Sequence, residues 1–379
     1  MSTLKVDTIT KADGTGSLGV PAESGTVVTT ASPSLGRRNL IINGAMQVAQ
    51  RGTSFTGIDG YGLDRHITDV FGGSTAVFNA EQSSDAPDGF SHSYKVTVST
   101  SETPSGSDAT SIFQHRIEGQ NIQHLGWGDT NVKHVTLSFW VKSSVTGDFP
   151  FGLEVFCTNS ADDTGFMQAY TINSANTWEF KTITIPLWDS SVSVVTPRGG
   201  NDFGIILRFG GGGVSTRQGV AGWQSRSTSL TGMSGAISFT SNASATWQIT
   251  GVQLEVGSVA TPFEHRSYGE ELALCQRYYI EWKDDGNLQF TANTTCTQND
   301  TVTGLKDLPV WMRVPPTVTS TSLQHSVGGL TNGLRTVNSV SSEIDQVSVQ
   351  CDWTHTEGSA HTGVLYTLAG SYVKADAEL

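Results

Sequence analysis

Short stretches that alternate apolar and polar residues recur between residue 39 and about residue 263, with turn-forming residues between them. The stretch VTLSFWVKSS (135–144) is the clearest, and it places Trp140 on the polar face. Its apolar face consists of Val135, Leu137, Phe139 and Val141. The others are HSYKVTVST (92–100), WEFKTITIP (178–186), DFGIILRF (202–209) and ATWQITGVQLEV (245–256). Because strand side chains alternate between faces and no helical pattern intervenes, this region predicts an all-β sandwich or barrel.

Composition agrees with a β-rich chain and narrows the function classes. The 379 residues include 42 glycines, and charged residues make up only 15%. The formal net charge is -13, and Arg37–Arg38 is the one adjacent basic pair that we find, which argues against a nucleic-acid groove. No run of residues has the length and apolarity of a membrane helix, and MSTLKVDTITKADGTG (1–16) has no secretory h-region. We therefore expect neither a nucleic-acid partner nor membrane insertion.

Residues 1–36 differ from the rest of the chain, because short apolar pieces alternate with Gly, Pro and Ser. Such a segment cannot bury a core of its own, so it is either disordered or a strand that pairs with another chain. The apolar residues Leu4, Val6 and Ile9 favour the second interpretation.

A single helical pattern interrupts the strands, in SYGEELALCQRYY (267–279). Ser267 and Glu270 have the spacing of a capping box, and apolar residues follow at helical spacing. The pattern predicts a helix from Tyr268 to about Tyr279 that connects the sandwich to a second, smaller β domain over 267–379. Strand candidates in that domain are YYIEW, LQFTA, TVTSTSL, VSVQCDW and VLYTLAGSYVKADA.

Several stretches resemble the tail-fibre and tail proteins of phages that infect marine and freshwater bacteria, cyanobacteria included. They are NLIINGAMQVAQRG (39–52), YGLDRH (61–66), VTLSFWVKSS (135–144), INSANTWEFKTITIP (172–186) and, most specifically, TGVQLEVGSVATPFEHRSYGEELALCQRYY (250–279). MSTLKVDTI and YVKADAEL at the two ends are similar to those fibres as well. The middle region also resembles jelly-roll carbohydrate-binding modules.

This resemblance implies a homotrimer within a virion, made in the host cytoplasm. Residues 1–36 would attach to the phage tail, baseplate or an adaptor protein. Residues 37–266 would form a jelly-roll carbohydrate-binding-like domain, and residues 267–379 would hold the helix and the last β domain. The fibre would recognise the host cell surface, through a glycan. A virion-associated glycan depolymerase and a purely structural linker or decoration fibre are the alternatives.

We expect no cofactor, and a structural calcium ion is in doubt. Related carbohydrate modules often carry an acidic residue after the Asn-Gly pair, where this chain has Gln47. The pairs Asp162–Asp163 and Asp284–Asp285 lack the ligand spacing of a known calcium loop, and turns explain them. The four cysteines form no CxxC pair, so we expect no zinc site and free, buried thiols.

The helix has more apolar surface than a connector on the protein surface needs. It either packs near a threefold axis and joins three chains or packs against its own sandwich. On the first alternative the trimer contacts are Leu272, Leu274 and Tyr278 in the helix and Leu4, Val6 and Ile9 near the N-terminus.

Sugars are held by flat aromatic rings and by polar groups that take their hydroxyls. A sheet face that combines Trp140 with Gln114, Arg116 and Arg208 would make a glycan groove, and Trp188 and Trp223 in loops are further candidates. The alternative is that Trp140 is a half-buried packing residue and that the loop tryptophans pack locally.

The motifs of common hydrolases, GxSxG and HExxH, are absent. Glu154, Glu179 and Glu255 could supply a glycosidase carboxylate pair only if the fold brings two of them together. The sequence therefore favours binding without catalysis.

Overall fold

The computed structural model describes residues 9–10, 17–18, 38–105, 109–127, 133–160, 163–186, 202–213, 218–225, 231–283, 289–296, 301–321, 323–327, 330–335, 337–352, 361–366 and 372–378. Within these ranges the backbone alone is described for residues 9–18, 203, 212–213, 289–304, 323–341 and 348–366. The chain divides into two compact units, Met1–Arg38 and Asn39–Leu379. The expected division of the chain after residue 36 into domains 37–266 and 267–379 stays a prediction.

The first unit contains one antiparallel strand pair, β1 (Ile9–Thr10) with β2 (Ser17–Leu18). Ile9 is opposite Leu18, so this strand pairs within its own chain. Leu4 and Val6 lie outside the described residues. The expected pairing of this segment with another chain stays a prediction.

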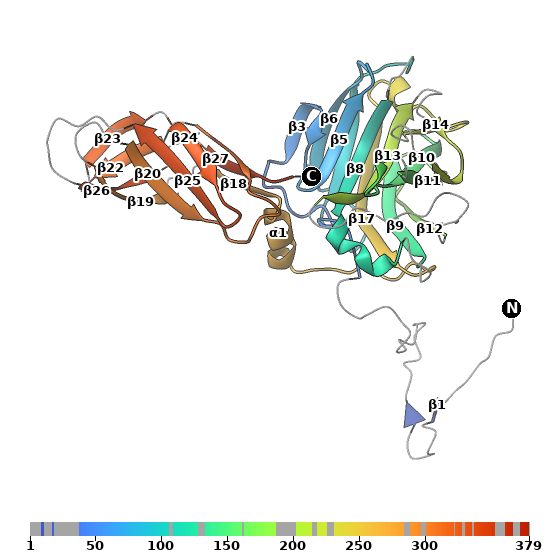
Figure 1. Cartoon of the computed structure of the whole chain (residues 1–379). Helices are drawn as coiled ribbons and strands as arrows, with labels where there is room; N and C mark the ends of the chain where they lie inside the picture. The colour runs from blue at the N-terminus through green and yellow to red at the C-terminus, as the bar shows by residue number, and fades with distance from the viewer. Residues whose placement is uncertain are drawn as a thin grey trace. The chain divides into compact units, whose positions relative to one another are not determined.

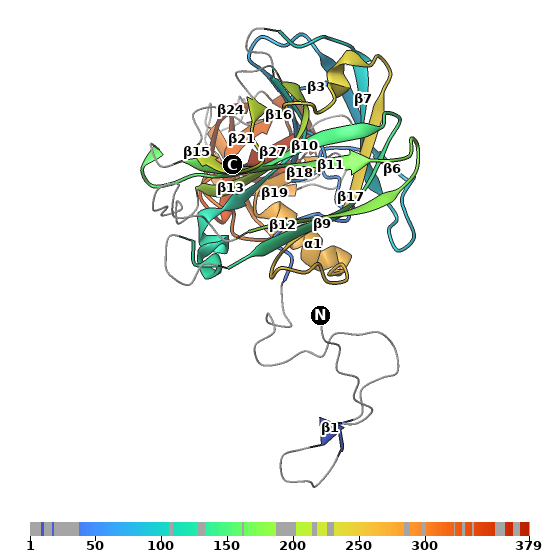
Figure 2. The same ribbon diagram turned by 90° about the vertical axis from the view of Figure 1, so that its right-hand side faces the viewer.

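Two antiparallel sheets form the sandwich of the second unit (Figure 1). The seven-stranded sheet has the order β15 (Gly222–Ser225), β11 (Thr164–Ile172), β10 (Gly147–Val155), β13 (Phe203–Gly213), β8 (Ala109–Glu118), β5 (His66–Phe71), β4 (Gly60–Tyr61). The six-stranded sheet has the order β12 (Glu179–Ile185), β9 (Val135–Ser143), β17 (Thr246–Val256), β7 (Ser93–Thr100), β6 (Val77–Ser83), β3 (Ser54–Ile58). Figure 2 shows β9 and β12 of one sheet below β10, β11 and β13 of the other.

The core of the sandwich fills the space between the two sheets. The apolar face expected in β9, Val135, Leu137, Phe139 and Val141, is fully buried, which confirms the alternation. Phe209 on β13 packs against Phe139 at 5.0 Å and against Trp247 at 5.6 Å between ring centroids. The buried Trp247 indole donates a hydrogen bond of 3.0 Å to the Tyr170 hydroxyl, so its one polar atom is satisfied. The all-β sandwich predicted from the sequence is therefore confirmed.

Strands after residue 278 form two more antiparallel sheets. One has the order β18 (Tyr279–Lys283), β27 (Tyr372–Asp376), β21 (Thr317–Ser320). The other has the order β23 (Leu330–Arg335), β22 (Leu323–Val327), β26 (His361–Tyr366), β19 (Gln289–Cys296), β20 (Thr301–Asp307), β25 (Gln346–Asp352), β24 (Val337–Ser342). Small elements in the sandwich are β14 (Gln218–Gly219), β16 (Gly232–Met233) and the 3-10 turns η1 (Gly119–Asn121), η2 (Gln123–Leu125) and η5 (Phe239–Ser241).

The predicted helix is α1 (Tyr268–Gln276), the one α-helix among the described residues. Its capping box is present: the Ser267 hydroxyl accepts from the Glu270 amide, and the Glu270 carboxylate accepts from the Ser267 amide at 3.0 Å. These bonds satisfy backbone donors that the first turn of a helix leaves open. The helix ends near Gln276 because the chain enters β18 at Tyr279.

The segment NLIING (39–44) is bonded to parts of the chain more than 200 residues away. The Asn39 side chain donates to Val252 O at 3.0 Å and accepts from the Leu254 amide at 3.1 Å, both on β17. The Asn43 amide donates to the Glu271 carboxylate of α1 at 2.5 Å. The Asn-Gly turn that carries the resemblance is therefore a structural junction between the sandwich and the helix.

A second junction links the sandwich to the chain after α1, through buried charges. Arg65 pairs with Glu378, and its guanidinium lies 3.5 Å from the centroid of the Tyr278 ring. Glu118 accepts from Arg277 at 3.0 Å and from the Tyr278 hydroxyl. Because an unpaired buried charge is costly, these residues couple the ordering of the two regions.

Two buried histidines are hydrogen-bonded through their rings to the backbone of the NLIING segment. The His66 ring donates to Asn43 O at 3.0 Å, and the His115 ring accepts from the Ile42 amide at 3.4 Å. Their ring centroids lie 5.4 Å apart. Burial lowers the pKa of His66 to about 3 and lowers the pKa of His115 well below its ordinary value.

We predict that stability falls as pH drops below about 6.5, the ordinary histidine pKa. In that range the unfolded chain binds protons at both histidines while the folded chain does not, so each costs up to about 1.4 kcal/mol per pH unit. Urea unfolding at pH 7.5, 6.5 and 5.5 measures this. A His115→Gln variant should lose part of the slope, and equal stability at the three pH values would contradict the prediction.

Candidate functional site

A pocket of about 270 Å³ lies on the outer face of the six-stranded sheet. Strand β9 contributes Ser138 and Trp140 to its lining, β12 contributes Phe180, and β17 contributes Gly251. The side chains of Ser138, Trp140 and Phe180 alternate with the core residues of the same strands, so they point away from the core. Two further segments complete the lining, residues 88–90 between β6 and β7 and residues 261–265 between β17 and α1.

Trp140 and Phe180 form one aromatic pair in this pocket. They are opposite each other in the register of β9 and β12, with ring centroids 5.3 Å apart. Phe180 is 47% exposed, although large aromatic side chains are usually covered. The pair therefore offers ring surface that the protein itself does not bury.

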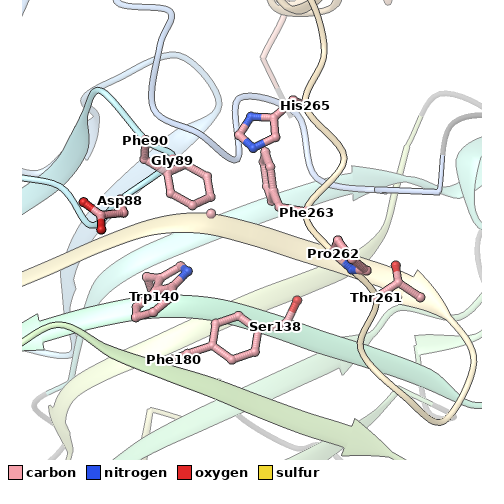
Figure 3. A pocket seen from close by; sticks show the side chains of 11 residues that line it. Asp88, Gly89, Phe90, Ser138, Trp140, Phe180, Thr261, Pro262, Phe263 and His265 are labelled. Carbon is pink, nitrogen blue, oxygen red and sulfur yellow. The ribbon is translucent and has the colours of Figure 1, made fainter. Parts of the chain in front are cut away.

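Three rings from the two loop segments line the pocket opposite this pair (Figure 3). The Phe90 and Phe263 centroids lie 5.0 Å apart in a T-shaped arrangement, with the edge of one ring toward the face of the other. The His265 ring lies 4.9 Å from Phe263 and 5.4 Å from Phe90. Figure 3 shows Phe90 and Phe263 on the other side of the β17 ribbon from Trp140 and Phe180.

Phe90 depends on a glycine in the middle of β17. The strand has a register shift between Thr250 and Gln253, and Gly251 within it has a φ of +61°. A Cβ at Gly251 would lie 2.6 Å from Cζ of Phe90, closer than such atoms approach. The irregular strand and its glycine therefore make the space that the Phe90 ring occupies.

Asp85 anchors the loop that carries Phe90 to the sheet. Its carboxylate pairs with Lys142 on β9, and accepts from Nε1 of Trp178 at 3.2 Å and from Nε2 of Gln248 at 3.3 Å. Desolvation raises the pKa of Asp85, but the hydrogen bonds from these three groups outweigh it and hold the pKa below its ordinary value. Asp85 thus connects the loop to three regions of the sheet face.

The segment that carries Phe263 is anchored in the same way to β17. The Glu255 carboxylate accepts from the Thr261 amide at 2.8 Å and from its hydroxyl at 2.6 Å. The Gln253 side chain accepts from the Glu264 amide at 2.8 Å. Both loop segments of the pocket are therefore fixed by side chains of the sheet.

The structure separates the residues that the sequence placed together around Trp140. Gln114, Arg116 and Arg208 lie on β8 and β13 of the seven-stranded sheet, whereas Trp140 lies on the other sheet. The expected groove of these four residues is therefore wrong. The sequence showed which residues share a face of one strand, but it did not show which strands share a sheet.

Arg208 and Gln114 are also covered rather than open to a ligand. Arg208 is 5% exposed, and it pairs with Glu154 at 3.2 Å and donates to the Gln114 side chain. A Cβ on Gly210, two residues further along β13, would overlap Thr231 O, so a segment of chain packs directly on this face. These side chains bond to one another on the covered outer face of the seven-stranded sheet.

The other predicted residues also lie outside the pocket. Trp223 is half-buried, packs on Phe166 at 5.5 Å and donates to Pro186 O at 3.2 Å, so it packs locally. Trp188 lies outside the described residues. Tyr278 is 1% exposed and serves the junction within its own chain, so its expected trimer contact is wrong. Leu272 and Leu274 are partly exposed, and their role in a trimer stays a prediction.

Sequence reasoning missed most of the pocket. Phe90, Phe263 and His265 lie in loops, and nothing in the sequence places those loops over the face of β9. The one available signal was that TPFEH falls within the most specific resembling stretch, 250–279.

The three glutamates considered as a catalytic pair do not line this pocket. Glu154 lies on β10 and pairs with Arg208, whereas Glu255 on β17 holds Thr261. Glu179 on β12 accepts from Lys181 at 2.6 Å and from the Asn173 and Ser174 amides. Each carboxylate is engaged in a different place.

Metal and membrane features can be stated for the described residues only. In these residues no three His, Cys, Asp or Glu side chains are grouped so that they could hold a metal ion. The described helices also include none with the length and apolarity needed to cross a membrane. The question of a calcium ion stays open.

Comparison with known proteins gives distant structural similarity. No protein-family model and no curated protein sequence matches the chain. The enzymatically active domain of tailspike protein 4 of bacteriophage CBA120 is 13% identical with a TM-score of 0.29; the match covers 57% of this chain and 21% of the tailspike chain. The family 11 carbohydrate-binding module of a Clostridium thermocellum cellulase is 14% identical over 56% of this chain and 98% of the module, with a TM-score of 0.29.

A Bacteroides thetaiotaomicron protein described as a "putative sugar binding protein" is 12% identical over 58% of this chain and 100% of its own, with a TM-score of 0.30. This chain spans about a fifth of the tailspike chain but nearly all of the two smaller proteins. TM-scores of this size carry no argument about fold or function. The function of the pocket must therefore be inferred from its own residues and contacts.

We predict that Gly251→Ala destabilises the protein by about 1–3 kcal/mol, because the new Cβ meets Phe90 and the positive φ becomes strained. Urea unfolding measures the loss. Gly269→Ala is the matched control, because it lies in the first turn of α1 with open space around it, and should be neutral or stabilising by up to about 1 kcal/mol. Equal stability of Gly251→Ala and the unsubstituted protein would contradict the role given to this glycine.

Proposed function

We propose that the pocket over β9, β12 and β17 binds a carbohydrate. The observation that carries this proposal is the aromatic pair of the half-buried Trp140 and the exposed Phe180, with Phe90 and Phe263 on the other side of the pocket. The C–H faces of a sugar ring stack on aromatic rings, while its hydroxyls need polar groups nearby. Asp88, which is exposed, supplies such a polar group at one end of the pocket, and Ser138 and Thr261 also line it.

The proposed role is binding without hydrolysis. Glycosidases use two carboxyl groups about 5–9.5 Å apart on either side of the scissile bond. Among the described residues that line the pocket, Asp88 is the single carboxylate. The geometry supports a site that holds a sugar and gives no second group to cleave it.

We propose further that this binding serves host recognition by a homotrimeric phage tail fibre. The support is the resemblance of 39–52, 61–66 and 250–279 to phage fibre proteins, together with the energetics of a shallow site. The pocket is small, about 270 Å³ against the usual ~300–1,000 Å³ for ligand sites, and we propose that one site binds weakly. Three linked sites engaged together would raise the effective affinity without new contacts.

In this proposal the N-terminal segment attaches to the tail, the baseplate or an adaptor protein, and the fibre is a virion component. The surface glycan of the host cell is the partner of the pocket. A glycan depolymerase is the second candidate, but no contact among the described residues favours it.

The first test replaces Trp140 with alanine. An array of immobilised oligosaccharides identifies a glycan that binds the full chain, and calorimetry then measures its affinity. Trp140→Ala should lower the affinity at least about tenfold, or ~1.4 kcal/mol, because the stacking surface is gone. Trp311→Ala is the control, because Trp311 is 69% exposed and outside the pocket. Equal affinity of the Trp140 variant and the unsubstituted protein would sink the proposed site.

The second test is the mass of the purified chain by light scattering. The fibre proposal predicts three times the chain mass of 40.3 kDa. Substitution of Leu272 and Leu274 by serine should lower the mass toward one chain if the partly exposed side of α1 joins the trimer. A mass of one chain at micromolar concentration would contradict the proposed trimer. It would not bear on the proposed sugar site.

A further inference from the structure

The described contacts limit what kind of sugar the pocket accepts. We infer that it takes a single neutral sugar unit at the end of a glycan chain or branch; this inference rests on the proposed carbohydrate function. Three observations carry it. The Asp85 anchor lies across one end of the pocket, the pocket volume is small, and the carboxylate of Asp88 is the one acidic group in the described lining, which has no lysine or arginine.

Closure comes from the Asp85 anchor. Along β9 the residue after Trp140 on the same face is Lys142, and Lys142 is bonded to Asp85 of the loop 84–92. Asp85 also accepts from Trp178, which directly precedes β12 and lies two residues before Phe180. The loop is therefore bonded to the sheet immediately beyond the aromatic pair. A glycan chain that continued along the sheet face at that end would meet this anchor, so we infer that the unit next to it is the last one of its chain.

Size agrees with one sugar unit. The pocket has about 270 Å³, whereas sites that enclose drug-sized ligands have ~300–1,000 Å³. Trp140 and Phe180 supply one paired ring surface, and Phe90 and Phe263 supply the surface opposite to it. Figure 3 shows Asp88 at one end of the pocket and Thr261 and Pro262 at the other, with the aromatic rings between them.

Charge sets the choice between neutral and acidic sugars. Asp88 lines the pocket, and no lysine or arginine does so among the described residues. Lys142 on the neighbouring position of β9 is already paired with Asp85 and lies 5.3 Å from the Trp178 ring. A sugar carboxylate or sulfate in the pocket would face the Asp88 carboxylate without a free cation to balance it.

Asp88 also gives a neutral sugar what it needs. An ionised carboxylate accepts two hydrogen bonds, and these are stronger than bonds between neutral groups. Two neighbouring sugar hydroxyls can donate to it at once. Asp88 is exposed, and no hydrogen bond or ion pair to another described residue engages its carboxylate.

The test uses an oligosaccharide array in which the same neutral chains end either in a neutral hexose or in the corresponding uronic acid. The full chain should bind a set that shares one neutral terminal unit, with signals that do not rise as the chain behind that unit grows. Uronic-acid ends should bind at least about tenfold more weakly.

The Asp88→Asn variant separates the charge from the shape of the pocket. This variant should bring the affinities for glycans with neutral and with acidic ends closer together, because it removes the charge repulsion but keeps an acceptor oxygen. Asp345→Asn is the control, because it removes an exposed charge away from the pocket. It should leave the ratio of the affinities for neutral-ended and acidic-ended glycans unchanged.

Binding to internal units, binding that strengthens with chain length, or equal binding of acidic ends would overturn this inference while the carbohydrate site itself stands. Binding that persists in full after Trp140→Ala, or no binding to any glycan on the array, would instead overturn the proposed function and this inference with it.

Discussion

The bond between the Asn43 amide and the Glu271 carboxylate ties the start of the sandwich to the helix that comes after its last strand. Arg266 strengthens this tie, because its guanidinium donates to Ile41 O at 3.0 Å and pairs with Glu271 at 3.3 Å. The segment 257–267 is thus held at its two ends, by β17 and by the NLIING segment. Because both ends of this segment are fixed, Phe263 and His265 are held in the lining of the pocket.

The same constraint explains why a β protein keeps one capped helix. A helix of nine residues is too short to be stable by itself, so it needs tertiary partners. Glu271 in its first turn supplies one partner, and the buried Cys275 and Tyr278 supply apolar contact. The charges of Arg65, Glu118 and Glu378 then connect the following strands to the sandwich. Specific buried polar bonds, rather than apolar area alone, determine how the parts of this unit join.

Local sequence patterns predicted much of the fold but little of the candidate site. Alternation placed Phe139 inside and Trp140 outside, and the spacing of Ser267 and Glu270 located the helix, because both signals act within a few residues. The pairing of Trp140 with Phe180, and the separation of Trp140 from Arg208, depend on strand order over the whole sandwich. Phe90 reaches the pocket only because Gly251 leaves room and Asp85 fixes its loop, and neither condition has a local signature.

The place of β17 in its sheet has a consequence for the nascent chain. This strand pairs with β9 on one side and with β7 on the other, about 150 residues earlier in the sequence. Until β17 has been synthesised, β7 and β9 each present an unpaired edge, and the six-stranded sheet exists only as two fragments. Long-range pairing of this kind slows folding, and open edges invite association with other chains. We expect the sandwich to be most prone to misassembly during synthesis, before β17 has been made and can pair with β7 and β9.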